Sequence, residues 1–187
     1  MTGRLKYGIV IAVVATALAV VAFRFHHPEN VTQHIFEGAP ISAVVETTKA
    51  DALKVVSVTD GDTLKVLNGK TVTIRLNGID CPEKAQAFGQ KAKQFTSEMV
   101  FGKLVTVKEK GRDRYGRTIG EVILEDGRNL NRELVRAGMA WWYRQYAPKD
   151  AELEVLELEA REAKRGLWVD ADPVPPWEWR KRKRKGD

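Results

Sequence analysis

The chain has 187 residues, of which 43% are hydrophobic and 30% charged; this balance excludes a disordered or fibrous protein and suits one ordinary domain with appendages. Lysine and arginine number 31 against 25 aspartates and glutamates, and the net charge of +6 favours a polyanionic partner, either nucleic acid or an anionic membrane surface. The single cysteine excludes an internal disulfide framework, and all three histidines lie before residue 35, so chemistry in the rest of the chain has no histidine base or ligand.

The N-terminal segment, residues 1–25, is expected to form a hydrophobic helix that anchors the protein in a membrane. Residues 7–23 are a 17-residue apolar run in which Thr16 is the only polar side chain, with basic residues on both sides. A signal sequence that is cleaved at the small residues near its end is the alternative. Under either interpretation, the remainder of the chain is exported. Residues 26–50 are expected to be a flexible tether.

Residues 51–169 carry the pattern of a folded domain. Alternating apolar residues and tight-turn pairs predict strands, and helical spacing of apolar residues predicts helices. The strands are expected over 53–58, 63–67, 71–79, 104–107 and 118–124, and the helices over 88–99, 131–137 and 149–165. Five strands with a helix between the third and the fourth follow the order of an OB-fold barrel. The predicted fold class is therefore α+β: a five-stranded OB-fold-type β-barrel with three helices, preceded by the N-terminal hydrophobic helix.

The last segment, residues 170–187, is a basic tail that contains prolines and tryptophans. Three prolines precede Trp177 and Trp179, and residues 180–185 are six consecutive arginines and lysines. The favoured interpretation is a solvated, disordered tail. The alternative is an arm that binds polyanions, with tryptophans that stack on bases or lie at a membrane interface.

Polar clusters at the predicted strand ends suggest chemistry when they are considered together. Each one alone is explained as a turn, a helix cap or a surface ion pair. The candidate residues are the carboxylates Asp62, Asp80 and Glu83 and the arginines Arg75 and Arg117. Carboxylate oxygens suit a hard cation such as calcium or magnesium, and guanidinium groups suit phosphate oxygens. Without a histidine, a carboxylate is the plausible base, so the set indicates metal-assisted phosphodiester hydrolysis.

The motifs that hold these residues resemble those of the staphylococcal-nuclease (thermonuclease) family. They are Val-Thr-Asp-Gly-Asp-Thr at 58–63, Ile-Arg-Leu-Asn-Gly-Ile-Asp-Cys-Pro-Glu at 74–83 and Asp-Arg-Tyr-Gly-Arg at 113–117. Leu-Val-Arg-Ala-Gly-Met-Ala-Trp at 134–141 and Gly-Leu-Trp at 166–168 extend the match. The resemblance covers essentially all of residues 51–169, in the family's order.

The resemblance implies a calcium site and a catalytic carboxylate. Asp62 and Asp80 would bind Ca²⁺, helped by the main-chain carbonyl of Cys81, and Glu83 would orient or deprotonate the attacking water. A calcium ion takes six to eight oxygens, and this motif supplies two or three. Water and substrate must provide the rest, so the site is expected to be weak and to work where calcium is abundant. An exported domain meets that condition.

The resemblance also implies how the substrate is held. Arg75 and Arg117 would grip the phosphate and stabilise the charge of the transition state. Tyr115 would hydrogen-bond a phosphate oxygen, with Tyr143 or Tyr146 nearby in the nucleotide pocket. The family cleaves single-stranded DNA and RNA readily and duplex DNA less so, without sequence specificity, and leaves 3′-phosphate products. The expected protein is a monomeric, exported, calcium-dependent endonuclease with no protein partner.

Two departures from the family pattern are present. The stretch from Glu83 to Gly89 is about half as long as in the family archetype, where a mobile loop lies beside the catalytic glutamate. Cys81 stands where the family has a small residue or threonine. Because no histidine in the domain can activate the thiol, Cys81 is interpreted as a backbone ligand with an incidental side chain.

Two other functions compete with the nuclease. One is a non-catalytic OB-type module that binds nucleic acid or another partner, and the other is an accessory role in an envelope or exopolysaccharide pathway. Family members that have become binding modules typically lose the acidic and arginine positions, whereas this chain retains all five.

Overall fold

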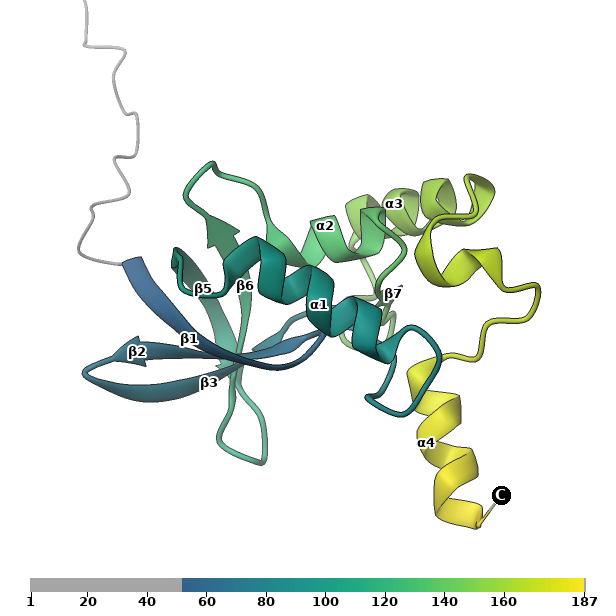
Figure 1. Cartoon of the computed structure of the whole chain (residues 1–187), viewed down its shortest axis with the longest axis horizontal. Helices are drawn as coiled ribbons and strands as arrows, with labels where there is room; N and C mark the ends of the chain where they lie inside the picture. The colour runs from purple at the N-terminus through teal and green to yellow at the C-terminus, as the bar shows by residue number, and fades with distance from the viewer. Residues whose placement is uncertain (1–51, 187) are drawn as a thin grey trace, which may run out of the picture. The chain divides into compact units, whose positions relative to one another are not determined.

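Five strands close into a barrel in the computed structural model, which describes residues 52–186 (Figure 1). Their bounds are β1 (Ala52–Asp60), β2 (Thr63–Asn68), β3 (Lys70–Leu76), β5 (Leu104–Arg112) and β6 (Thr118–Leu124). The order around the barrel is β1-β2-β3-β6-β5, and β5 pairs with β1 to close it. The β3–β6 pair is parallel and the other pairs are antiparallel. The predicted OB-type barrel is confirmed.

The barrel interior is filled by the apolar residues that alternate along the strands. Val55, Leu64, Val66, Ile74 and Val122 are each at most 1% exposed and belong to one continuous core. Burying side chains of this size stabilises the fold by roughly 1.5–3 kcal/mol each. Polar residues between them point outward and can serve a site on the barrel surface.

Two helices, α1 (Gly89–Val100) and α2 (Leu130–Arg136), pack on this barrel, and α3 (Ala151–Glu162) packs against α2. The α1 helix crosses one face of the barrel, and its buried residues Ala92 and Val100 join the core (Figure 1). Asn129 and Asp150 begin α2 and α3, because their side chains accept hydrogen bonds from the first-turn N–H groups. A short 3₁₀ helix, Gly166–Val169, follows α3.

The predicted third strand was too long. It ends at Leu76, and the turn at Asn77 and Gly78 requires a φ of +73° at the glycine, a conformation that breaks the ladder. A separate two-residue strand, β4 (Ile79–Asp80), follows and pairs with β7 (Trp141–Trp142). The strand predicted over 104–107 was too short, because β5 continues to Arg112 as the partner of β6.

The expectation of a disordered tail is wrong, although residues 181–186 are exposed to solvent. Residues Pro176–Lys185 form a further helix, α4, with Pro176 at its first position, where a missing N–H costs nothing. In Figure 1 this helix lies beside the loop that precedes α1, and a hydrogen bond from Gln86 to the carbonyl of Val174 joins the two segments. The fourth helix therefore contributes to the surface next to the polar clusters.

The predicted membrane anchor and tether, residues 1–50, lie outside the described residues. Within residues 52–186, none of the helices has the length and apolar character needed to cross a membrane.

Candidate active site

Two buried carboxylates converge on one arginine at the end of the barrel. Asp62 lies in the turn between β1 and β2, and Asp80 is the last residue of β4. Arg75 of β3 lies between them, with Nη1 2.7 Å from Asp62 Oδ2 and Nη2 2.8 Å from Asp80 Oδ1. The structure therefore brings three of the predicted site residues into direct contact. The alternation along β3 directs Arg75 away from the core, and the carboxylates cover it there.

The turn that holds Asp62 is fixed by close packing against Cys81 and α1. Asp62 Oδ2 accepts a hydrogen bond from the Cys81 N–H at 2.7 Å, and buried Thr96 of α1 donates to the Gly61 carbonyl at 2.6 Å. A Cβ added at Gly61 would lie 2.8 Å from the Cys81 side chain and 2.9 Å from Ala92. Glycine at this position lets the Asp62 turn reach the Asp80 segment.

Burial changes the proton affinities of this cluster. It raises the pKa of Asp80, which is 1% exposed, although hydrogen bonding to an arginine opposes the change. Burial and the neighbouring charge of Asp62 raise the pKa of Asp60 to about 6. Burial lowers the pKa of Arg75, but the charges of Asp62 and Asp80 outweigh it and leave the pKa raised. Arg75 is therefore a permanent positive charge between the carboxylates.

Glu83 lies on the short segment between β4 and α1. The Gln86 side chain accepts a hydrogen bond from the Glu83 N–H at 3.1 Å, and the Gln86 N–H donates to the Glu83 carbonyl at 2.8 Å. A Cβ at Gly89 would overlap that same carbonyl oxygen, so the backbone closes tightly on itself. The Glu83 side chain is 41% exposed and faces solvent at the edge of the cluster.

Arg180 of α4 completes the cluster, although it is not among the site residues that the sequence motifs predict. Its Nη2 lies 2.7 Å from Asp80 Oδ2, and its Nη1 lies 2.8 Å from Glu83 Oε1. Burial lowers the pKa of Arg180, whereas the hydrogen bonds to Asp80 and Glu83 raise it more strongly. The sequence did hold one signal of a docked helix, which is a proline pair followed by a tryptophan and an arginine three residues apart.

Arg117 and Tyr115 lie in a neighbouring hollow. This hollow has a volume of about 320 Å³ and lies between the 112–117 turn and the outer side of β3. Arg117 Nε donates to Asp113 Oδ2 at 2.6 Å, and the Tyr115 hydroxyl accepts from Arg114 at 2.7 Å. Within residues 52–186, no hydrogen bond or ion pair joins Arg117 to Asp62, Asp80 or Glu83.

The strand register nevertheless keeps Arg117 close to the cluster. Thr118, the next residue, pairs with Ile74 in the parallel β3–β6 ladder, and Ile119 pairs with Arg75. Arg117 therefore directly precedes β6, the strand beside the one that carries Arg75.

The two candidate tyrosines of the nucleotide pocket are in contact with each other. Tyr143 follows β7, and its ring meets that of Tyr146 edge-on at 4.8 Å. Tyr143 also stacks on Trp177 of α4, with ring centroids 5.1 Å apart and planes 8° apart. Because β7 pairs with β4, Tyr143 lies on the Asp80 side of the molecule.

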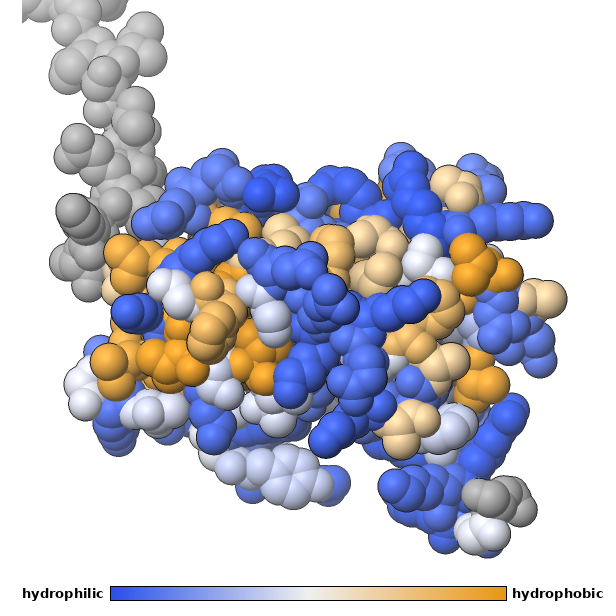
Figure 2. Space-filling model, viewed as in Figure 1, coloured by the Kyte–Doolittle hydropathy of each residue, from blue (hydrophilic) through white to orange (hydrophobic). Residues whose placement is uncertain are grey.

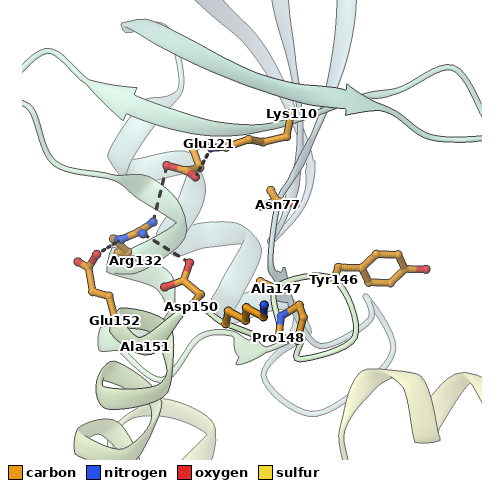
Figure 3. Close-up of a pocket in the computed structure, with 11 residues that line it drawn as sticks. Asn77, Lys110, Glu121, Arg132, Tyr146, Ala147, Pro148, Asp150, Ala151 and Glu152 are labelled. Atoms are coloured by element: carbon orange, nitrogen blue, oxygen red, sulfur yellow. Dashed lines mark hydrogen bonds and ion pairs between the residues drawn. The ribbon is translucent and has the colours of Figure 1, made fainter.

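Tyr146 also lies at the edge of a different region. It lines a shallow groove of about 690 Å³, in which Arg132 pairs with Glu121, Asp150 and Glu152 (Figure 3). The tyrosine ring points away from that network in Figure 3. The groove contains none of the carboxylates that converge on Arg75.

Comparison with known proteins identifies the family. The family model described as "Staphylococcal nuclease homologue" matches residues 73–170. An uncharacterized endonuclease of Escherichia coli O157:H7 is 54% identical over 131 residues, which cover 70% of this chain and 85% of that protein. The chain belongs to the staphylococcal nuclease family. The resemblance found in the sequence motifs is confirmed.

Other relatives extend the family match. A micrococcal nuclease of Shigella flexneri is 44% identical over 138 residues, which cover 68% of this chain and 79% of that protein. The staphylococcal-like nuclease CAN1 of Arabidopsis thaliana is 35% identical over 165 residues, which cover 86% of this chain and half of that protein. The match to the staphylococcal nuclease family model ends at residue 170, before α4 begins.

The donor atoms present are of the type that suits the calcium ion this family implies, but they are fewer than calcium requires. Within the described part of the chain, no three acidic, cysteine or histidine side chains gather closely enough to form a metal site by themselves. Asp62 and Asp80 offer hard oxygen ligands that already face a positive charge, the Arg75 guanidinium. Calcium bound by these two carboxylates and the Cys81 carbonyl would need further oxygens from water and substrate.

The thiol of Cys81 is unsuited to nucleophilic chemistry. Its side chain is 4% exposed, and burial raises the pKa of the thiol well above its usual value, with the charge of Asp62 adding to the rise. The surroundings of the Cys81 thiol agree with the interpretation of Cys81 as a backbone ligand with an incidental side chain.

Proposed function

We propose that this member of the staphylococcal nuclease family is a calcium-dependent endonuclease that hydrolyses phosphodiester bonds of DNA and RNA. Single strands are the preferred substrates, recognised without sequence specificity, and the products end in 3′-phosphates. The observation that carries the proposal is the convergence of Asp62 and Asp80 on Arg75, with Glu83 at the open edge of the same cluster. The relatives named as nucleases support the same reaction class.

Each polar residue has a distinct task in this proposal. Asp62, Asp80 and the Cys81 carbonyl hold the calcium ion, which when bound supplies positive charge to the scissile phosphate. Glu83 accepts a proton from the attacking water, a task that suits its solvent-facing position. Arg75 stays protonated at every working pH and neutralises charge on the phosphate oxygens.

The second arginine acts from the neighbouring hollow. Arg117 has its Nε held by Asp113, so its terminal nitrogens are left to meet phosphate oxygens. A 3′-phosphate product requires that the bond from phosphorus to the 5′-oxygen breaks, and the departing oxygen carries negative charge. Guanidinium donors on the substrate side stabilise that charge as it develops. Tyr115 adds a hydroxyl to the same hollow, and Tyr143 or Tyr146 contacts the nucleotide.

We also propose that the domain works outside the cytoplasm, as a monomer, held by residues 1–25 in the membrane or released from them. A calcium site with few protein ligands is expected to be weak, and an extracytoplasmic location supplies the calcium that it requires. Protease treatment of cells with a permeabilised outer envelope and an intact cytoplasmic membrane, followed by immunoblotting of the chain, would test this location. Protection of the domain until the cytoplasmic membrane is lysed would contradict it.

Cleavage of a 5′-labelled single-stranded DNA oligonucleotide tests the proposed activity. The whole chain should cleave it in calcium and stop when a chelator is added. Treatment of the products with a 3′-phosphatase should then slow their migration, because each labelled fragment loses charge. Products that the phosphatase leaves unchanged would contradict the proposed bond. A folded protein that binds the strand in calcium without cutting it would favour the non-catalytic module.

A further inference from the structure

The C-terminal helix α4 delivers a second arginine to the acidic cluster, beside Arg75. The Arg180 guanidinium contacts both oxygens of Asp80, at 2.7 and 3.3 Å, and the Glu83 carboxylate at 2.8 Å. The two acidic residues lie about 100 positions earlier in the chain, so only the fold brings these groups together. Arg180 is the single residue of the described chain whose side chain pairs with Glu83.

Aromatic packing and a backbone contact hold α4 in this position. Trp177 stacks on Tyr143 and meets Trp141 edge-on, with ring centroids 5.7 Å apart. Residues three apart on a helix share a face, so the stacking of Trp177 directs Arg180 to the cluster. On the segment that precedes α4, the Val174 carbonyl accepts a hydrogen bond of 2.6 Å from the Gln86 side chain.

Glu83 needs an external partner more than Asp80 does. Asp80 is buried on β4 and already paired with Arg75, whereas Glu83 lies on a short irregular segment with a 41% exposed side chain. A long, solvent-facing side chain samples several rotamers unless a partner fixes one of them. Gln86 joins the backbone of this segment to the tail, and Arg180 joins the carboxylate to it.

The other basic residues of α4 do not share this role. Lys181 pairs with Glu178 at 2.7 Å, and residues 182–185 are exposed. Figure 2 shows that hydrophilic residues dominate the part of the surface where α4 lies. The basic run is therefore divided between one arginine that faces the cluster and several residues that face solvent.

We propose that Arg180 is a positioning residue that holds the Glu83 carboxylate beside Asp80 in its working orientation, and that α4 is a wall of the active site. The α4 wall supplies the support that the short segment after Glu83 lacks. The role of Arg180 in turnover rests on the proposed nuclease function, whereas the physical link between α4 and Glu83 is independent of it.

Kinetics of Arg180→Ala and Arg182→Ala in the whole chain test the positioning role. Arg180→Ala should lower kcat for single-stranded DNA by roughly 10- to 100-fold, as loss of a supporting partner does at other sites, with little change in KM. Arg182→Ala removes the same charge from the exposed face of α4 and should keep kcat. Equal losses in both variants, or a loss confined to KM, would contradict positioning and indicate general attraction of the polyanion. A higher rate in Arg180→Ala would contradict it too and indicate that the helix blocks the site.

Amide hydrogen exchange provides a readout that needs neither substrate nor calcium. In Arg180→Ala, the amides of residues 83–87 should exchange several-fold faster, while those of the barrel strands keep their protection. Unchanged exchange over 83–87 would contradict the link between α4 and Glu83. If the unaltered chain does not cleave DNA but these amides exchange faster in Arg180→Ala, the proposed nuclease function is wrong and the link between α4 and Glu83 is supported.

Two further variants separate positioning from folding. Arg180→Lys keeps a positive charge that reaches one carboxylate at a time, so it should restore part of the lost kcat. Trp177→Ala leaves the acidic residues and Arg180 intact but removes the stack on Tyr143, so it should reproduce the kcat loss and the faster exchange. Full activity in Trp177→Ala would contradict the role of α4 as a wall.

Discussion

Replacing Glu83 with glutamine is expected to lower kcat for single-stranded DNA by about 10²- to 10⁴-fold, the contribution typical of a positioned general base. Glutamine keeps the size of the side chain and one oxygen for Arg180, but it cannot accept a proton from water. Because Glu83 lies at the solvent edge of the cluster, the substitution leaves the buried pairs of Arg75 intact. Single-turnover cleavage, measured together with binding of the same oligonucleotide, checks the expectation.

A matched substitution separates this effect from a change of charge. Glu98→Gln on the exposed side of α1 removes one carboxylate whose partner is Gln94, away from the cluster. That variant should cleave as the unaltered chain does. If Glu83→Gln lost oligonucleotide binding instead of turnover, the base would have to be sought elsewhere.

Arg117→Ala should reduce kcat/KM by roughly 100- to 1,000-fold, or about 3–4 kcal/mol of transition-state stabilisation, as removal of one preorganised donor does elsewhere. The structure gives a reason for preorganisation, because Asp113 fixes the Arg117 side chain through its Nε and also accepts a hydrogen bond from the Arg117 N–H. Steady-state kinetics on a short single-stranded substrate provides the measurement.

Arg114 offers the control for this substitution. It lies in the same turn, donates to the Tyr115 hydroxyl and is exposed. Arg114→Ala removes an equal charge and should cost little by comparison. A loss under tenfold in Arg117→Ala, or one matched by Arg114→Ala, would remove Arg117 from the catalytic set.

The barrel could be predicted from the sequence because its signals are local. The pairs Asp60-Gly61 and Asn68-Gly69 mark tight turns, and the residues that alternate around Arg75 indicate both a strand and an outward side chain. The ladder between β4 and β7 was not predicted, because two-residue strands leave no periodic pattern. The split of the third strand follows from a turn that a single glycine makes possible.

Arg180 illustrates why part of the site stayed hidden. Within the basic run 180–185, residue type alone does not distinguish Arg180 from Arg182 or Arg184, and the spacing from Trp177 is a signal only if the segment is known to be helical. Arg180 is the arginine that reaches the cluster because Trp177 stacks on Tyr143, a residue more than 30 positions earlier. Contacts of this kind come from tertiary packing, so sequence alone left the segment as a solvated tail or a polyanion-binding arm.

The most direct test of the account is a calcium titration of cleavage by the unaltered chain and by Asp80→Asn. Asparagine keeps the shape of the buried side chain but removes its charge, so half-maximal cleavage should require at least about tenfold more calcium, as weakening of a cation ligand predicts. Cleavage by the unaltered chain should cease in a chelator, and circular dichroism should verify that the variant is folded. Cleavage that persists in the chelator, or an identical calcium midpoint in the folded variant, would contradict a calcium site built on Asp80.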